Sequence, residues 1–234
     1  MTGLIYMVYP EKIYVMMDTL CTCGDSKKPF NYASKIYLLP HLKTIMCGTG
    51  QVDIIRYWYN FIQNNIMAKN FNYLIKKAPS VLLDIWKNYK NKEDLSVTIY
   101  HFGYDKSNKK FVGYAFRSTN DFKAQKIENG FGFKPELPKK EELSDIDIGE
   151  QTNYIDVLKE IFKRMKERDD KKEISEKVGI GGEIQLAIYD KPNSIHFLTI
   201  YKFSDFEEKF TEMLNEGQKQ NLEQAVKDFM KEFK

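Results

Sequence analysis

Thr2 is the residue with the clearest chemical potential in the sequence. If Met1 is removed, Thr2 carries both a hydroxyl group and a free α-amine. A hydroxyl alone is a weak nucleophile and needs a base to accept its proton. The α-amine has an unperturbed pKa of roughly 7.7–8.0, so it can be that base near neutral pH. The ordinary alternative is that Thr2 simply begins a strand.

Two charged residues, Asp18 and Lys35, follow Thr2 at informative positions. Asp18 ends the second predicted strand, and Lys35 opens the third. This order of threonine, aspartate and lysine, with one extra residue assumed in the loop at 21–34, resembles that of proteasome β-subunits and the related bacterial peptidase of the HslV type. Both belong to the N-terminal-nucleophile (Ntn) hydrolases. Without the resemblance, Asp18 and Lys35 are equally a structural ion pair or two unrelated surface charges.

Short motifs extend the resemblance over most of the chain. The family's lysine-led apolar strand has a counterpart in KIYL at 35–38. Its glycine-rich turn, which ends in aspartate and opens a helix, resembles CGTGQVD at 47–53. A Gly-Tyr-Asp turn and a Gly-Gly strand entry resemble FGYD at 102–105 and GGEI at 181–184.

The resemblance implies a catalytic role for each matching residue. Thr2 Oγ attacks a carbonyl carbon. Lys35 lowers the cost of forming an alkoxide through its positive charge, and Asp18 keeps that lysine charged and fixed. An amide N–H in the Gly48–Thr49 turn, at the start of a helix, binds the oxyanion.

The resemblance also implies how a substrate is held. Thr22 matches a loop residue that binds an extended peptide through its backbone. Cys21, Cys47 and Gln51 are expected to line the pocket beside it. The implied function is therefore hydrolysis of a peptide or amide bond by a threonine peptidase that needs no metal or organic cofactor and assembles as a homo-oligomer.

Three positions depart from the family pattern. Active proteasome subunits support the nucleophile with a serine in a Gly-Ser-Gly turn, and with an aspartate and a serine just before the Gly-Gly pair. These places read Phe131, Lys177 and Ile180. Missing support usually loosens a catalytic residue. The alternative function is a catalytically inactive subunit of the proteasome fold, kept for assembly or as a scaffold. A third class, a small-ligand module in the cleft at Gly48, has no support from particular residues.

Hydrophobic periodicity predicts the strands that must position these residues. Stretches rich in Gly, Pro, Asn or charged residues, at 18–34 and 134–150, are predicted as loops. The predicted strands are 4–9, 12–18, 35–39, 43–47, 95–104, 110–117, one near 124–130, 184–189 and 195–201.

Helical spacing of apolar residues predicts helices at 51–67, 71–89 and 153–166. Pro79 is expected to kink or split the second helix. The charge run at 167–177 is either a frayed helix end or a loop.

The C-terminal segment at about 204–233 is predicted as helical, with Ser204 and Glu207 in a capping-box pattern. This order of elements predicts an α+β fold, a four-layer αββα sandwich of two antiparallel sheets between helical layers, in one domain over 1–234. A strictly alternating βαβ arrangement does not fit.

Composition narrows the function classes further. The net charge is +3, from 36 basic and 33 acidic residues, which gives no strong field for nucleic acid or an anionic membrane. Three cysteines are too few for a disulfide framework and favour a reducing compartment. The N-terminus lacks the features of a signal peptide, and no apolar run is long enough to cross a bilayer. We therefore expect a cytoplasmic protein.

No metal site is expected. Cys21 and Cys23 lack a second paired cluster, and the three histidines are scattered. Asp145 and Asp147 lack the spacing of an EF-hand and are expected in a solvated loop. The glycines at 48–50 and 179–182 lack the further residues of a phosphate-binding loop.

Overall fold

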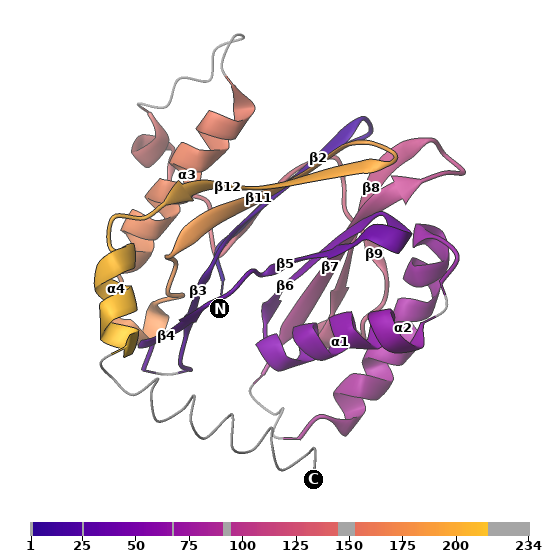
Figure 1. Ribbon diagram of the computed structural model, residues 1–234, viewed down its shortest axis with the longest axis horizontal. Coiled ribbons are helices and arrows are strands. Elements are labelled where there is room, and N and C mark those ends of the chain that lie inside the picture. Colours follow the sequence, from indigo (N-terminus) through magenta and orange to yellow (C-terminus); the bar gives the residue numbers. More distant parts are fainter. Residues whose placement is uncertain (1, 25, 67, 91–94, 145–152, 215–234) are drawn as a thin grey trace.

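The computed structural model describes residues 2–24, 26–66, 68–90, 95–144 and 153–214. Two five-stranded antiparallel sheets lie face to face, and helices cover the outer face of each sheet (Figure 1). This arrangement confirms the predicted α+β fold with four αββα layers.

The first sheet has the order β10-β1-β2-β11-β12, and the second has the order β5-β6-β7-β8-β9. A separate hairpin pairs β3 with β4. The strands of the first sheet are β1 (Leu4–Tyr9), β2 (Lys12–Asp18), β10 (Gly130–Lys134), β11 (Glu183–Lys191) and β12 (Ser194–Lys202). Those of the second are β5 (Ile36–Leu39), β6 (Thr44–Gly50), β7 (Val97–Asp105), β8 (Lys110–Arg117) and β9 (Gln125–Lys126), and the hairpin comprises β3 (Leu20–Thr22) and β4 (Pro29–Tyr32).

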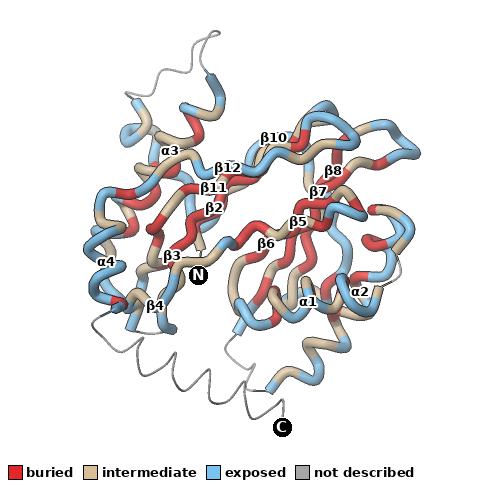
Figure 2. The backbone as a smooth tube through the Cα atoms, in the orientation of Figure 1, coloured by how far each residue is buried: buried red, intermediate tan, exposed pale blue. Residues whose placement is uncertain are grey.

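Four α-helices among the described residues complete the layers. Helices α1 (Val52–Asn65) and α2 (Phe71–Asn88) cover the second sheet, and α3 (Tyr154–Asp170) covers the first. Helix α4 (Phe206–Met213) packs beside β4. Three apolar clusters fill the three interfaces between the layers, so buried backbone concentrates in the central strands (Figure 2).

Strands β1 and β2 are rich in apolar residues on both sides because both of their faces are covered. Leu4 and Val15 point into the cluster between the two sheets, whereas Ile5 and Met16 pack against α3. Alternate residues of a strand face opposite sides of the sheet, and a doubly covered strand therefore reads as a continuous apolar run. The hairpin predicted for this part of the chain is confirmed.

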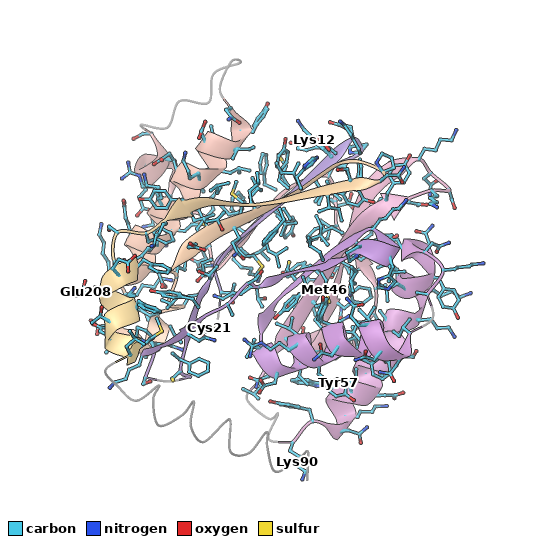
Figure 3. All side chains as sticks on the ribbon, in the orientation of Figure 1. Lys12, Cys21, Met46, Tyr57, Lys90 and Glu208 are labelled. Atoms are coloured by element: carbon cyan, nitrogen blue, oxygen red, sulfur yellow. The ribbon has the colours of Figure 1, made fainter. Side chains whose placement is uncertain are left out.

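Helix α1 buries one stripe of its surface against the second sheet. Ile54, Ile55, Trp58 and Ile62 recur at helical spacing and are buried there, with Met46 of β6 beneath them (Figure 3). Tyr57 lies on the outer side of the same helix and is exposed.

Several expected elements differ from the observed ones. The loop predicted at 18–34 contains the β3–β4 hairpin, and the glycines of 48–50 extend β6 instead of forming a turn. Helix α2 continues through Pro79 from Phe71 to Asn88. Helix α3 runs on to Asp170 because Val157, Phe162 and Met165 bind it to the sheet.

The predicted capping box at Ser204 is wrong. Asp205 is the N-cap of α4, without a side-chain cap, and Glu207 binds Lys202 instead. The rest of the predicted C-terminal helix, at 215–233, and the acidic pair Asp145 and Asp147 lie outside the described residues.

Candidate active site

A cavity of about 300 Å³ opens between the β3–β4 hairpin, the end of β6 and the start of α1. Apolar and polar side chains share its wall. Of the nine site residues expected from the sequence, it contains Thr2, Cys21, Thr22, Lys35, Gly48 and Gln51. Residues separated by up to about fifty positions in the sequence therefore meet at one place, as predicted from their order.

Lys35 and Asp18 form a buried ion pair beside this cavity. Lys35 Nζ lies 2.9 Å from both carboxylate oxygens of Asp18 and 2.6 Å from the carbonyl oxygen of Leu20. Asp18 is completely buried, and Lys35 is 9% exposed. Burial raises the pKa of the Asp18 carboxyl, while the Lys35 charge opposes that rise.

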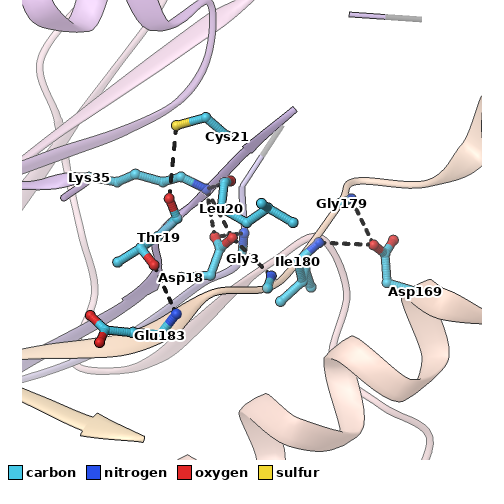
Figure 4. Close-up of polar contacts among 11 residues, drawn as sticks. Gly3, Asp18, Thr19, Leu20, Cys21, Lys35, Asp169, Gly179, Ile180 and Glu183 are labelled. Atoms are coloured by element: carbon cyan, nitrogen blue, oxygen red, sulfur yellow. Dashed lines mark hydrogen bonds and ion pairs between the residues drawn. The ribbon is translucent and has the colours of Figure 1, made fainter. Parts of the chain in front are cut away.

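The Asp18 carboxylate also binds the backbone next to Thr2. Asp18 Oδ1 accepts a hydrogen bond of 2.9 Å from the Gly3 amide, and Oδ2 accepts one of 3.2 Å from the Gly181 amide (Figure 4). One carboxylate thus joins the residue after Thr2, the end of β2, the loop before β11 and the lysine before β5. This network fixes the backbone at Gly3 relative to Lys35.

The end of β6 supplies backbone to the cavity. Cys47 pairs with Ile36, the first residue of β5, so residues 48–50 pair only with β7. Gly48 is required there because a Cβ atom would lie 2.7 Å from Ile55 Cδ1 and 3.0 Å from the Thr98 carbonyl oxygen. Helix α1 begins just beyond, after Gln51.

Cys47, Thr49 and Asp18 do not line the cavity. Asp18 acts on it only through Lys35. Cys47 is buried in the cluster between the sheets, where burial raises the pKa of its thiol. The expectation that it lines the pocket is wrong, because an odd-numbered residue of β6 faces the other sheet. Thr49 shares that face and hydrogen-bonds Tyr100.

Asp169, near the end of α3, is a structural carboxylate that sequence reasoning missed. It is buried and accepts a hydrogen bond of 2.8 Å from the amide of Val178. It accepts two more, of 2.8 and 3.2 Å, from the amides of Gly179 and Ile180 (Figure 4). An acid in the last turn of a helix opposes the helix dipole. The position of Asp169 in the last helical turn was therefore the sequence signal that its carboxylate binds a partner outside the helix.

Arg56 and Tyr37 also line the cavity without having been predicted. Val52, Ile55 and Arg56 lie three and four residues apart, so they share one face of α1. That spacing was the available signal for Arg56. Tyr37 is half-buried; burial raises the pKa of its hydroxyl, and a hydrogen bond with Arg56 lowers it.

Of the three departures from the family pattern, Ile180 lies in an apolar setting, Phe131 is exposed and Lys177 is partly buried. Ile180 is buried within 3.3 Å of a Cβ position at Gly3. Phe131 is 47% exposed on the edge strand β10 and stacks on Phe133. These residues supply no hydroxyl to the neighbourhood of Thr2.

Comparisons with known proteins give a structural likeness alone. No family model matches the chain, and no curated protein does. Among 489 matching chains of solved structures is Anbu from Hyphomicrobium sp. strain MC1, with a TM-score of 0.59 and 12% identity over 97% of each chain. At this identity the likeness shows the fold alone: the chain shares the proteasome-like, four-layer architecture of that structure.

The family resemblance inferred from the sequence is corrected by these findings. It pointed to proteasome β-subunits and the HslV-type peptidase, whereas the comparisons give an Anbu-like, proteasome-like fold without a matching family model. The motif matches therefore do not assign the chain to either of those two families.

The described residues hold neither a metal-binding cluster nor a membrane-spanning helix. No cluster of three or more His, Cys, Asp or Glu residues that could hold a metal ion is found among them. Within the same residues, no helix is both long and apolar enough to span a membrane.

Proposed function

We propose that this protein is a threonine hydrolase of the N-terminal-nucleophile type, which cleaves a peptide or amide bond on a proteasome-like fold. The observation that carries the proposal is the contact network at Thr2. Thr2 and Lys35 line one cavity, and the Asp18 carboxylate binds both Lys35 and the amide of Gly3.

The proposed reaction begins after removal of Met1. Thr2 Oγ attacks the carbonyl carbon of the substrate, and its proton passes to the α-amine of Thr2. The carbon–nitrogen bond then breaks, and the leaving amine takes up a proton from that α-amine. Water hydrolyses the resulting ester at Thr2, which releases the acid and restores the hydroxyl.

Lys35 and the backbone at Gly48 provide charge stabilisation in this scheme. The Lys35 ammonium lowers the cost of negative charge on Thr2 Oγ. Lys35 is held by Asp18 at 2.9 Å, so little reorganisation is needed during the reaction. Residues 48–50 pair with β7 only, and we assign the oxyanion to an amide at this edge of β6.

Peptide-amide turnover by the purified full chain tests this proposal. Thr2→Ala is expected to lower turnover to background because the nucleophile is lost, whereas Thr2→Ser keeps part of it. Thr211→Ala, on the exposed surface of α4, is the matched control and should turn over substrate like the parent. Equal turnover by the parent and Thr2→Ala would refute a nucleophilic role for Thr2.

The second candidate is a catalytically inactive subunit that serves assembly or a scaffold. The buried, apolar Ile180 beside Gly3 favours this candidate. Active proteasome subunits, which the sequence resembles, carry a serine at the position of Ile180. A protein with a free Thr2 amine that fails to react with a threonine-directed electrophile would support this candidate. A Thr2 adduct would exclude it.

Assembly and location are part of the same proposal. We propose a cytoplasmic homo-oligomer of single-domain subunits, in line with the proteasome-like fold. The free cysteines Cys21 and Cys23, neither of them buried, suit a reducing compartment. Light scattering of the purified chain should give a mass several times that of one chain; a monomer at all concentrations would contradict this.

A further inference from the structure

Arg56 projects from α1 into the wall of the Thr2 cavity. It lies four residues after Val52 and one after Ile55, and all three line the same space. Tyr37, on β5, contacts Arg56 by a side-chain hydrogen bond and packs against Tyr59 of α1 at 4.9 Å between ring centroids. Arg56 is therefore positioned by a helix face and by an aromatic wall.

No carboxylate of the described residues neutralises the charge of Arg56. Among the described residues, Arg56 forms no ion pair with an aspartate or glutamate. Within the part of the chain that the structure describes, no aspartate or glutamate lines the cavity, and the other lysine or arginine there, Lys35, is paired with Asp18. Asp53, the nearest acid along the chain, lies in the outer groove between α1 and α2 and accepts a hydrogen bond from Gln51.

A half-buried guanidinium without a carboxylate partner favours an anionic ligand. Arginine binds a carboxylate through two parallel hydrogen bonds, which gives both strength and geometric selectivity. Val52, Ile55 and Tyr37 supply apolar surface beside it for the methylene groups of a side chain. An acidic amino-acid side chain combines these two requirements.

We propose that Arg56 selects an aspartate or glutamate side chain of the substrate, next to the bond that Thr2 attacks. This inference rests on the proposed function. It assigns Arg56 to specificity, with no part in proton transfer. The same residue would exclude lysine and arginine side chains from the cavity by charge repulsion.

Competing peptide amides that differ at one residue test the proposal. The full chain is given substrates with glutamate, leucine or lysine before the scissile bond, and kcat/KM is measured for each. The parent is expected to prefer glutamate to lysine by about tenfold or more, the usual weight of a charge-assisted hydrogen bond. Arg56→Glu should reverse this order, and Arg56→Ala should remove it.

Lys76→Glu is the matched charge-reversal control. Lys76 is exposed on α2 and does not line the cavity, so this variant should keep the preference of the parent. Turnover of the leucine substrate reports on the catalytic proposal separately from the specificity proposal. If leucine is cleaved through Thr2 but the glutamate-to-lysine ratio is near one, or is the same in Arg56→Glu, the specificity assignment is overturned. If no substrate is cleaved and Thr2 resists electrophiles, the proposed function itself fails.

Discussion

At the residue scale, the Asp18–Lys35 pair combines structural and chemical roles that mutation can separate. Removing Lys35 alone leaves a buried carboxylate without its cation. Such a change usually costs about 3–5 kcal/mol of stability, whereas replacing both partners is much better tolerated. In either variant, the amides of Gly3 and Gly181, which bind the Asp18 carboxylate, would still lie beside residue 18.

Lys35→Met is expected to lower the free energy of unfolding by about 3 kcal/mol or more and to abolish reaction at Thr2. The double variant Asp18→Asn with Lys35→Met should recover part of that stability because no unpaired charge remains, yet it should stay inactive. Urea unfolding and electrophile labelling measure the two effects. An active double variant would show that Lys35 has no chemical role.

His101 makes the stability of the fold sensitive to acid. It is completely buried, its Nε2 accepts a hydrogen bond of 2.8 Å from the Trp58 indole, and burial lowers its pKa from 6.5 to about 3. Below pH 6.5 the unfolded chain binds a proton that the folded chain does not. The stability contribution of neutral His101 is therefore complete above pH 6.5 and is lost as the pH falls towards 3.

The loss from this residue is about 1.4 kcal/mol per pH unit within that window. His101→Gln should flatten the fall in unfolding free energy between pH 6.5 and 4. His196→Gln, an exposed histidine on β12, should leave the fall unchanged. Urea unfolding at several pH values measures these slopes, and identical slopes for the parent and His101→Gln would refute the account.

At the element scale, the junction between β6 and α1 depends on glycine. Gly50 has a φ of 96°, and a Cβ atom there would lie 2.0 Å from the Ser96 carbonyl oxygen. The left-handed backbone and this contact both exclude a larger residue. The start of α1, with Gln51 at its N-cap, is held against the sheet by this close approach.

Gly50→Ala is expected to lower the free energy of unfolding by at least about 2 kcal/mol. Gly24→Ala is the matched control, because a Cβ atom at Gly24 meets nothing within 4 Å and that residue needs no positive φ. It should change stability by less than about 0.5 kcal/mol. Thermal or urea unfolding compares the two, and similar effects would argue against a strained junction.

Elements with strong periodicity could be predicted from the sequence, whereas those fixed by distant contacts could not. The β1–β2 hairpin and α1 follow from alternation and helical spacing. The β3–β4 hairpin was missed because its short strands are surrounded by turn residues such as Gly24 and Pro29, and its pairing depends on neighbours from elsewhere in the chain. The strand predicted near 124–130 contains β9, whereas the edge strand β10 was missed for the same reason, since β1 pairs with it across more than a hundred residues.

The candidate site, like the fold, could be predicted from the sequence only in part. From the order of Thr2, Asp18 and Lys35 the sequence predicted one site; Asp18 and Lys35 pair beside the cavity that Thr2 lines, and their catalytic roles stay predictions. The sequence order did not identify Arg56 or Asp169, because their roles depend on residues that only the fold brings next to them. Cys47 was placed wrongly because its pocket role was taken from the family resemblance, whereas in the fold it alternates with Gly48 along β6 and faces the other sheet.

At the scale of the whole molecule, the outer helical layer is coupled to the site through the first sheet. Phe162 of α3 is fully buried, and its ring lies 2.8 Å from a Cβ position at Gly3. Asp169, near the end of α3, also binds the loop that precedes β11. The packing of α3 therefore supports the backbone on which Thr2 sits.

Phe162→Ala is expected to cost about 3–5 kcal/mol of stability, because it leaves a cavity between α3 and the first sheet. Phe197→Ala, on the exposed edge strand β12, should cost much less. Urea titration of both variants measures these two losses of unfolding free energy. Equal losses would mean that α3 contributes no more to the core than an exposed edge residue does.

The identity of the first residue of the mature chain tests the central claim most directly. Intact-mass analysis with N-terminal peptide sequencing of the purified full-length protein gives it in one measurement. The account predicts that Met1 is absent and that the chain begins at Thr2 with an unmodified α-amine. Retention of Met1, or a blocked amine on Thr2, would contradict the account because no base would then be attached to the nucleophile.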